Sequence, residues 1–118
     1  MTLDFHASSV NIGALTNAVR PLFKVPAGLG GISVVAANVY QMAAGTVSLN
    51  LVQLGTAGTA VGGTLATLGS AVYTSGMPKP FVVTTPFVDP NYWVGIEEKG
   101  VGTCNAITMV DIEYVVGK

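Results

Sequence analysis

The sequence predicts an all-β fold, a single-domain antiparallel β-sandwich that is jelly-roll-like, with about seven or eight short strands. Two observations lead to this prediction. Apolar and polar residues alternate along several short stretches, which is typical of strands with one buried face. Turns rich in Gly and Pro separate these stretches at intervals of roughly eight to twelve residues, a spacing that favours a sandwich over a parallel α/β sheet.

The last strand, residues 106–116, carries the clearest alternation. Its even positions are mostly apolar, whereas Asp111 and Glu113 lie on the odd face. Residues 91–99 form a second strand of this kind, and residues 100–105 supply Gly and Asn for a turn. The sequence therefore predicts that these two strands pair antiparallel.

Further strands are expected earlier in the chain. Pro21 lies within a strand over residues 18–26 and cannot donate a ladder hydrogen bond, so this strand belongs at a sheet edge or contains a bulge. Residues 32–41 also fit a helical spacing, but their β-branched residues and flanking glycines favour a strand buried on both faces. In residues 46–51 the odd, apolar positions are expected inward, and the short link over residues 42–45 predicts a hairpin.

Loops are expected where Gly and Pro gather. Residues 26–31 form a turn, and residues 55–63 form a loop that leads into a strand over residues 64–68. Residues 70–77 form a second loop before a strand over residues 81–85.

The N-terminal part is the least regular. Residues 1–17 lack sustained periodicity and are interpreted as an extended arm or edge segment, followed by a β-sandwich domain over residues 18–118. We expect the arm to reach onto a neighbouring subunit.

Charged residues are scarce. The chain has 118 residues, enough for one domain with a real core, and 9% of them are charged, against roughly 25% in ordinary soluble domains. A membrane segment does not explain this deficit, because the most apolar run, residues 31–54, is interrupted by polar residues. Coverage of the surface by other subunits explains it better, since interface cores are depleted of charge.

Charge and cysteine content exclude further classes. The net charge of -1, without a basic cluster, gives no electrostatic basis for binding nucleic acid. A single cysteine forms no intrachain disulfide, and the N-terminus lacks the pattern of a signal peptide, so synthesis in a cytoplasm is expected.

No catalytic, cofactor-binding or metal-binding constellation is expected, and the protein is predicted not to be an enzyme. His6 and Cys104 are the only residues of their types and have no evident partners. Glu97 and Glu98 are neighbours in a strand and should point to opposite faces. The glycines of residues 55–63 match no nucleotide-binding motif.

Apolar and aromatic residues are instead the candidates for contact with other chains. Trp93, on the face opposite Tyr92, fits either a subunit contact or a platform on which a sugar stacks. The candidate interface residues share an apolar side chain on the arm or on an outward face: Leu3, Phe5, Trp93, Ile107, Met109 and Val115.

Three stretches, residues 23–32, 92–99 and 110–118, give the chain a resemblance to small structural proteins of tailed-phage virions that decorate or cement the capsid. The resemblance implies a β-rich, non-catalytic protein that binds the outer capsid surface. Its implied partners are the major capsid protein and copies of itself, with a homotrimer expected.

The predicted function is therefore a capsid decoration protein on the virion surface, made in the host cytoplasm. A carbohydrate- or receptor-binding module of a fibre or spike tip, with Tyr40, Tyr92 or Trp93 as the stacking platform, is the alternative. A tail-tube or head-completion subunit would share the low charge.

Overall fold

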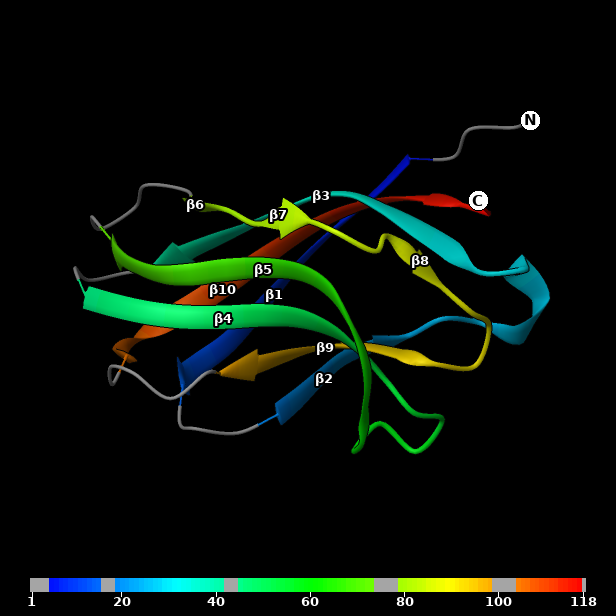
Figure 1. Ribbon diagram of the computed structural model, residues 1–118, viewed down its shortest axis with the longest axis horizontal. Helices are drawn as coiled ribbons and strands as arrows, with labels where there is room; N and C mark the ends of the chain where they lie inside the picture. The colour runs from blue at the N-terminus through cyan, green and yellow to red at the C-terminus, as the bar shows by residue number, and fades with distance from the viewer. Residues whose placement is uncertain (1–4, 16–18, 42–44, 74–78, 99–103, 118) are drawn as a thin grey trace.

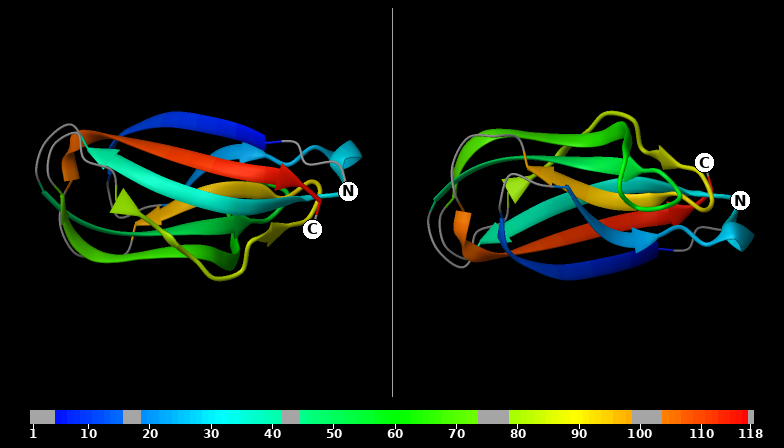
Figure 2. Two further views of the ribbon diagram at one scale, coloured as in Figure 1. Left: turned by 90° about the horizontal axis from the view of Figure 1, so that it is seen from above. Right: turned by 90° about the horizontal axis from the view of Figure 1, so that it is seen from below.

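Two antiparallel sheets pack face to face in the computed structural model, which describes residues 5–15, 19–41, 45–73, 79–98 and 104–117 (Figures 1 and 2). The strands are β1 (Phe5–Leu15), β2 (Val19–Lys24), β3 (Ile32–Gln41), β4 (Gly45–Leu54), β5 (Val61–Tyr73), β6 (Lys79–Pro80), β7 (Val82–Val83), β8 (Phe87–Val88), β9 (Trp93–Glu98) and β10 (Cys104–Val116), with one short 3-10 helix, η1 (Ala27–Leu29).

The strand order is that of a jelly roll. Sheet A has the order β1-β10-β3-β6, and β8 also pairs with β3; sheet B has the order β2-β9-β4-β5-β7. Because β6 and β8 both pair with β3, they are two pieces of one strand position. Counted so, and with the two-residue strand β7 left out, sheet A holds the first, eighth, third and sixth strands, and sheet B the second, seventh, fourth and fifth. The predicted all-β sandwich is confirmed.

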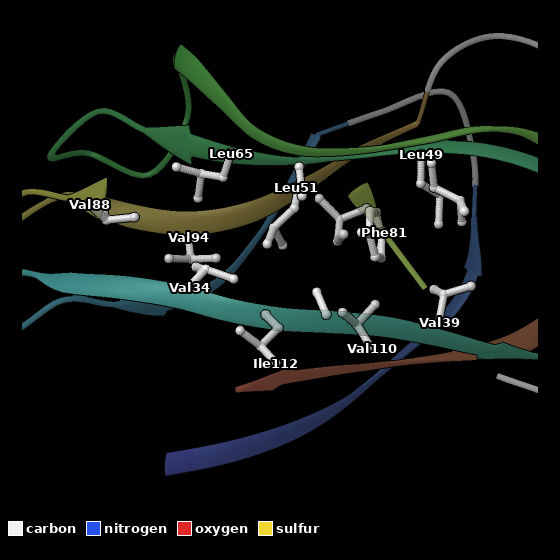
Figure 3. Close-up of a cluster of buried hydrophobic side chains, with 14 of the residues drawn as sticks. Val34, Val39, Leu49, Leu51, Leu65, Phe81, Val88, Val94, Val110 and Ile112 are labelled. Carbon is white, nitrogen blue, oxygen red and sulfur yellow. The ribbon is translucent and has the colours of Figure 1, made fainter. Parts of the chain in front are cut away.

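The core fills the space between the two sheets (Figure 3). Aliphatic side chains dominate it, with Phe81 as its one buried aromatic residue among those described. The residues of the core cluster are less than a tenth exposed: Val25, Ile32, Val34, Ala37, Val39, Leu49, Leu51, Leu65, Ala66, Leu68, Phe81, Val88, Val94, Ile96, Val110 and Ile112.

Two predicted strand pairings are wrong. β9 lies in sheet B between β2 and β4, whereas β10 lies in sheet A between β1 and β3. β3 and β4 likewise belong to different sheets and form no hairpin. Alternation in the sequence identifies a buried face but not the neighbouring strand, and in a jelly roll many connections cross between the sheets.

The prediction that residues 32–41 are buried on both faces is also wrong. Val35 is 48% exposed, because β3 bulges there and the β3–β10 register shifts between Glu113 and Tyr114. The bulge moves the buried positions from even, as at Val34, to odd, as at Ala37. The sequence therefore has apolar residues at even positions before the bulge and at odd positions after it. This pattern resembles that of a strand buried on both faces.

β5 is longer than predicted. It runs over Val61–Tyr73, where the sequence indicated a loop as far as residue 63 and another from residue 70. Glycines therefore lie inside this strand, whose register with β4 shifts in three places. Pro21 matches its prediction fully, since β2 is an edge strand and its register with β9 shifts between Pro21 and Phe23.

The N-terminal segment joins sheet A. β1 pairs with β10 as the terminal strand of the sheet, with an unbroken register over residues 5–11. Residues 1–4, 16 and 17 of the predicted arm lie outside the described part of the chain.

Candidate interaction surfaces

The outer face of sheet A combines apolar and acidic side chains. Met109 pairs with Tyr40, Asp111 with Asn38, and Glu113 with Ala36, so the odd residues of β10 lie on the side away from the core. Met109 is 36% exposed, and Val35 bulges outward one residue before Ala36.

This face brings together only part of the predicted interface. Met109 and the half-buried Val115 lie on it, and Phe5 pairs with Val115 through the backbone. Leu3 and the side chains of Phe5 and Ile107 lie outside the described part of the structure. Trp93 is on sheet B and does not join this surface.

Trp93 holds the loop between β4 and β5 against the outer face of sheet B. Its Nε1 donates a hydrogen bond to the carbonyl oxygen of Thr56, at 3.1 Å. A Cβ atom on Gly58 would lie 3.3 Å from the indole ring, so the loop backbone packs closely against it. The side chain is half-buried, and its indole N–H already has a partner within the chain.

A second apolar layer lies under this tryptophan. Val52 pairs with Gly95, and Leu54 pairs with Trp93, which places them on the side of sheet B away from the core. Val52 and Leu54 are nonetheless fully buried. A Cβ atom on Gly95 would lie 2.6 Å from Leu54 Cδ1, so the absent side chain leaves room for Leu54.

The sequence did not indicate this layer, although it offered a signal. Continuous apolar residues 51 and 52, followed by Leu54, break the alternation at the end of β4. Such a break is expected where both faces of a strand are covered.

The three aromatic residues of the predicted sugar platform lie on different surfaces. Trp93 is on the outer face of sheet B, Tyr40 is on the outer face of sheet A, and Tyr92 packs against the core. They therefore remain three separate alternatives, of which Trp93 packs against the loop between β4 and β5.

Trp93→Phe removes the indole N–H donor and so tests the role of Trp93 as a clamp, meaning that its side chain holds the β4–β5 loop against sheet B. Trp93→Phe is expected to lower the free energy of unfolding by about 1 kcal/mol, because it leaves the Thr56 carbonyl without this donor. Limited proteolysis should show faster cleavage in residues 55–60. Tyr92→Phe is the control, and equal cleavage of the two variants would contradict the clamp.

The adjacent carboxylates point to opposite faces, as predicted. Glu97 pairs with Asn50 on the outer face of sheet B, whereas Glu98 pairs with the core residue Leu49. Glu98 is 7% exposed, and Oε2 has no hydrogen-bond partner among the described residues. The pair therefore cannot act together on one substrate.

Burial dominates the electrostatics of Glu98. It raises the pKa of this carboxyl above its ordinary value of 4.5, and the positive charge of Arg20 opposes that rise. Arg20 pairs with Ile96, two residues before Glu98 on the same side of the sheet. Folding therefore shifts the protonation equilibrium of Glu98 towards the neutral carboxyl, relative to the unfolded chain.

This burial makes stability depend on pH. Because the pKa is raised on folding, the folded chain binds more protons than the unfolded chain between pH 4.5 and the raised pKa. Stability should fall as pH rises through that window. Glu98→Gln should remove this loss and raise the free energy of unfolding at pH 7 by about 1 kcal/mol.

Denaturant titrations at pH 4 and pH 7 would measure the effect. Glu97→Gln is the control, since it removes one negative charge from the outer face of the same strand. Equal gains in the two variants would show that net charge, and not burial, is responsible.

Other candidate chemistry is sparse. Within the described ranges, no cluster of three or more His, Cys, Asp and Glu residues is suited to holding a metal ion. Cys104 is the first residue of β10, not part of a turn as predicted, and pairs with Leu15; His6 is in β1 and pairs with Tyr114. The side chains of His6 and Cys104 are outside the described part. No helix among the described residues has the length and hydropathy needed to cross a membrane.

Comparison with protein-family models, with curated proteins and with solved structures found no match to this chain.

Proposed function

We propose that this chain is a non-enzymatic structural protein of a virion, which decorates the outer surface of the capsid and stabilises it through subunit contacts. The observation that supports it best is the outer face of sheet A, where Val35 and Met109 are exposed beside Asp111 and Glu113. The low charge of the chain and its resemblance to decoration proteins agree with this proposal.

The mechanism is mechanical and not chemical. Each apolar side chain that the capsid covers contributes about 25 cal/mol per Å² of area removed from water. The exposed carboxylate of Glu113 adds specificity, because a partner must offer a cation or a hydrogen-bond donor where this carboxylate lands. A rigid sandwich that spans two capsid subunits would resist their separation.

Binding to capsids tests the proposal directly. Purified protein is added to tailed-phage capsids stripped of their decoration, and its occupancy is measured by sedimentation and gel densitometry. Saturable binding, with a rise in the temperature at which the capsids disrupt, is expected. The absence of saturable binding would contradict the proposal.

A pair of valine variants identifies the binding face. Val35→Asp should weaken capsid binding about tenfold or more, because it removes apolar contact and buries a charge. Val82→Asp is the matched control, since Val82 is 65% exposed on the outer face of sheet B. Deleting residues 1–17 is less informative, because it would remove β1 from sheet A.

A second candidate function is carbohydrate binding, favoured by the fixed position of Trp93. A ring held by a hydrogen bond and by loop packing needs little ordering when a sugar stacks on it. Trp93 is the single tryptophan of the chain, so its fluorescence reports on this site alone. Saturable quenching by one glycan in a screen would favour this function over decoration.

A further inference from the structure

The edges of the two sheets differ in how they are protected. Edge strands invite pairing with other chains, and proteins block this with Pro, charged residues, bulges or very short strands. β2, the edge of sheet B, combines Pro21, a bulge, Arg20 and Lys24. At the opposite side, β6, β7 and β8 are two residues long.

β1 has none of these protections over residues 5–11. It is the terminal strand of sheet A, and its register with β10 is unbroken through this stretch. The stretch contains no Pro, Lys, Arg, Asp or Glu. Figure 2 shows β1, in dark blue, beside β10 at the border of the sheet.

We infer that β1 is a strand-addition site and that its partner is β1 of a second copy of this chain. Two copies related by a two-fold axis would pair antiparallel and join their A sheets into one continuous sheet. An axis at Ser8 uses the whole regular stretch, and small residues, Ala7 and Ser9, then lie opposite one another.

Electrostatics favours a second copy as the partner. Self-pairing places each residue type near its own copy, so a charged strand would repel itself, and this stretch contains no Lys, Arg, Asp or Glu. The acidic residues that pair with this stretch, Asp111 and Glu113, lie one strand inward on β10. Across the pair they are separated by three strand spacings, about 14 Å, beyond the Debye length of about 8 Å at physiological salt.

Sheet B has one other open edge segment among the described residues. β5 beyond Thr67 pairs with β4 and has no second strand neighbour in the described part of the chain. Addition of β1 to that segment of another copy would be head-to-tail and would build rings such as trimers. The number of chains in the assembly therefore distinguishes these two arrangements.

Native mass spectrometry and light scattering over a range of concentrations form the first test. A dimer that dissociates on dilution is expected. A trimer or larger ring would overturn the inference, as would a monomer at the highest concentration reached. Capsid binding is a separate measurement, so the inference and the proposed function can fail independently.

Proline substitutions at two adjacent positions form the second test. Backbone N–H groups alternate in direction along a strand, so one of Ser8→Pro and Ser9→Pro removes a donor from the β10 ladder and the other removes one from the free edge. The variant that keeps the thermal stability of the wild type should be monomeric, with a dimer dissociation constant raised about tenfold or more. A stable variant that remains dimeric would overturn the inference.

Ser9→Lys covers the case in which both proline variants unfold. Ser9 pairs with Asp111, so the new cation has a favourable neighbour within its own chain. In the proposed pair, the two lysines would be diagonal neighbours and repel, so the dimer should weaken and strengthen again with added salt. Ser9→Ala is the uncharged control and should leave the dimer intact; an unweakened dimer in Ser9→Lys would contradict the inference.

Discussion

Gly31→Ala is expected to lower the free energy of unfolding by about 3 kcal/mol or more, whereas Gly28→Ala should leave it nearly unchanged. Gly31 has a φ of +98°, a value that residues with a side chain rarely adopt. A Cβ atom there would also lie 2.5 Å from the ring of Phe87 and 2.7 Å from the carbonyl oxygen of Val88.

The two obstacles differ in how they can be relieved. The Phe87 ring can rotate away, but the Val88 carbonyl belongs to the β3–β8 pair, in which Ile32 is its partner. Moving that backbone would disturb the strand position that β6 and β8 share. Gly31 also accepts a hydrogen bond from the Gly117 N–H at 2.9 Å, so the end of β10 would be affected too.

Chemical denaturation of both variants measures this effect. Gly28 is only three residues away, in η1, and a Cβ atom there would have no heavy atom within 4 Å beyond its chain neighbours. The comparison therefore separates the loss of backbone freedom in the unfolded chain from the strain at Gly31. Equal stabilities of Gly28→Ala and Gly31→Ala would contradict the geometry of this turn.

The faces of strands were easier to predict than their neighbours. The inward positions of β9 and β10 follow from alternation, and Val94, Ile96, Val110 and Ile112 are all buried. The sheet to which each strand belongs depends on connections that cross the sandwich, and turn residues look the same in a crossing as in a hairpin. For that reason the predicted β9–β10 pair failed although both strands were located.

Bulges limited the prediction in a second way. A bulge adds one residue to a strand and reverses its alternation, as at Val35, so a half-buried strand reads as a fully buried one. In β5 repeated register shifts and glycines hid both ends of a strand that was predicted only over residues 64–68. Local sequence does not reveal such shifts, because the partner strand determines them.

The candidate surfaces, like the fold, were predicted only in part from the sequence. Met109 and Val115 share an outward face because both are odd residues of one regular strand. The placement of Trp93 required the fold, since its partners are Leu54 on β4 and the Thr56 carbonyl in the following loop. Such contacts join residues that are far apart in the sequence, so the alternation of apolar and polar residues does not predict them.

Leu54→Ala is expected to lower the free energy of unfolding by about 2 to 5 kcal/mol, as for a residue in a hydrophobic core. Leu54 lies on the side of sheet B away from the main core, but it is fully buried beside Trp93 and Gly95. If the outer face of sheet B were an ordinary solvent-exposed face, the same change would cost less than about 0.5 kcal/mol.

Val82→Ala provides the comparison, because Val82 lies on the same outer face and is 65% exposed. A double-mutant cycle between Leu54→Ala and Trp93→Phe then tests whether the two side chains act as one layer. We expect a coupling energy of about 0.5 kcal/mol or more, since they are cross-strand neighbours. Denaturant titrations of the four proteins give this value, and strict additivity would mean that the loop, rather than Trp93, covers Leu54.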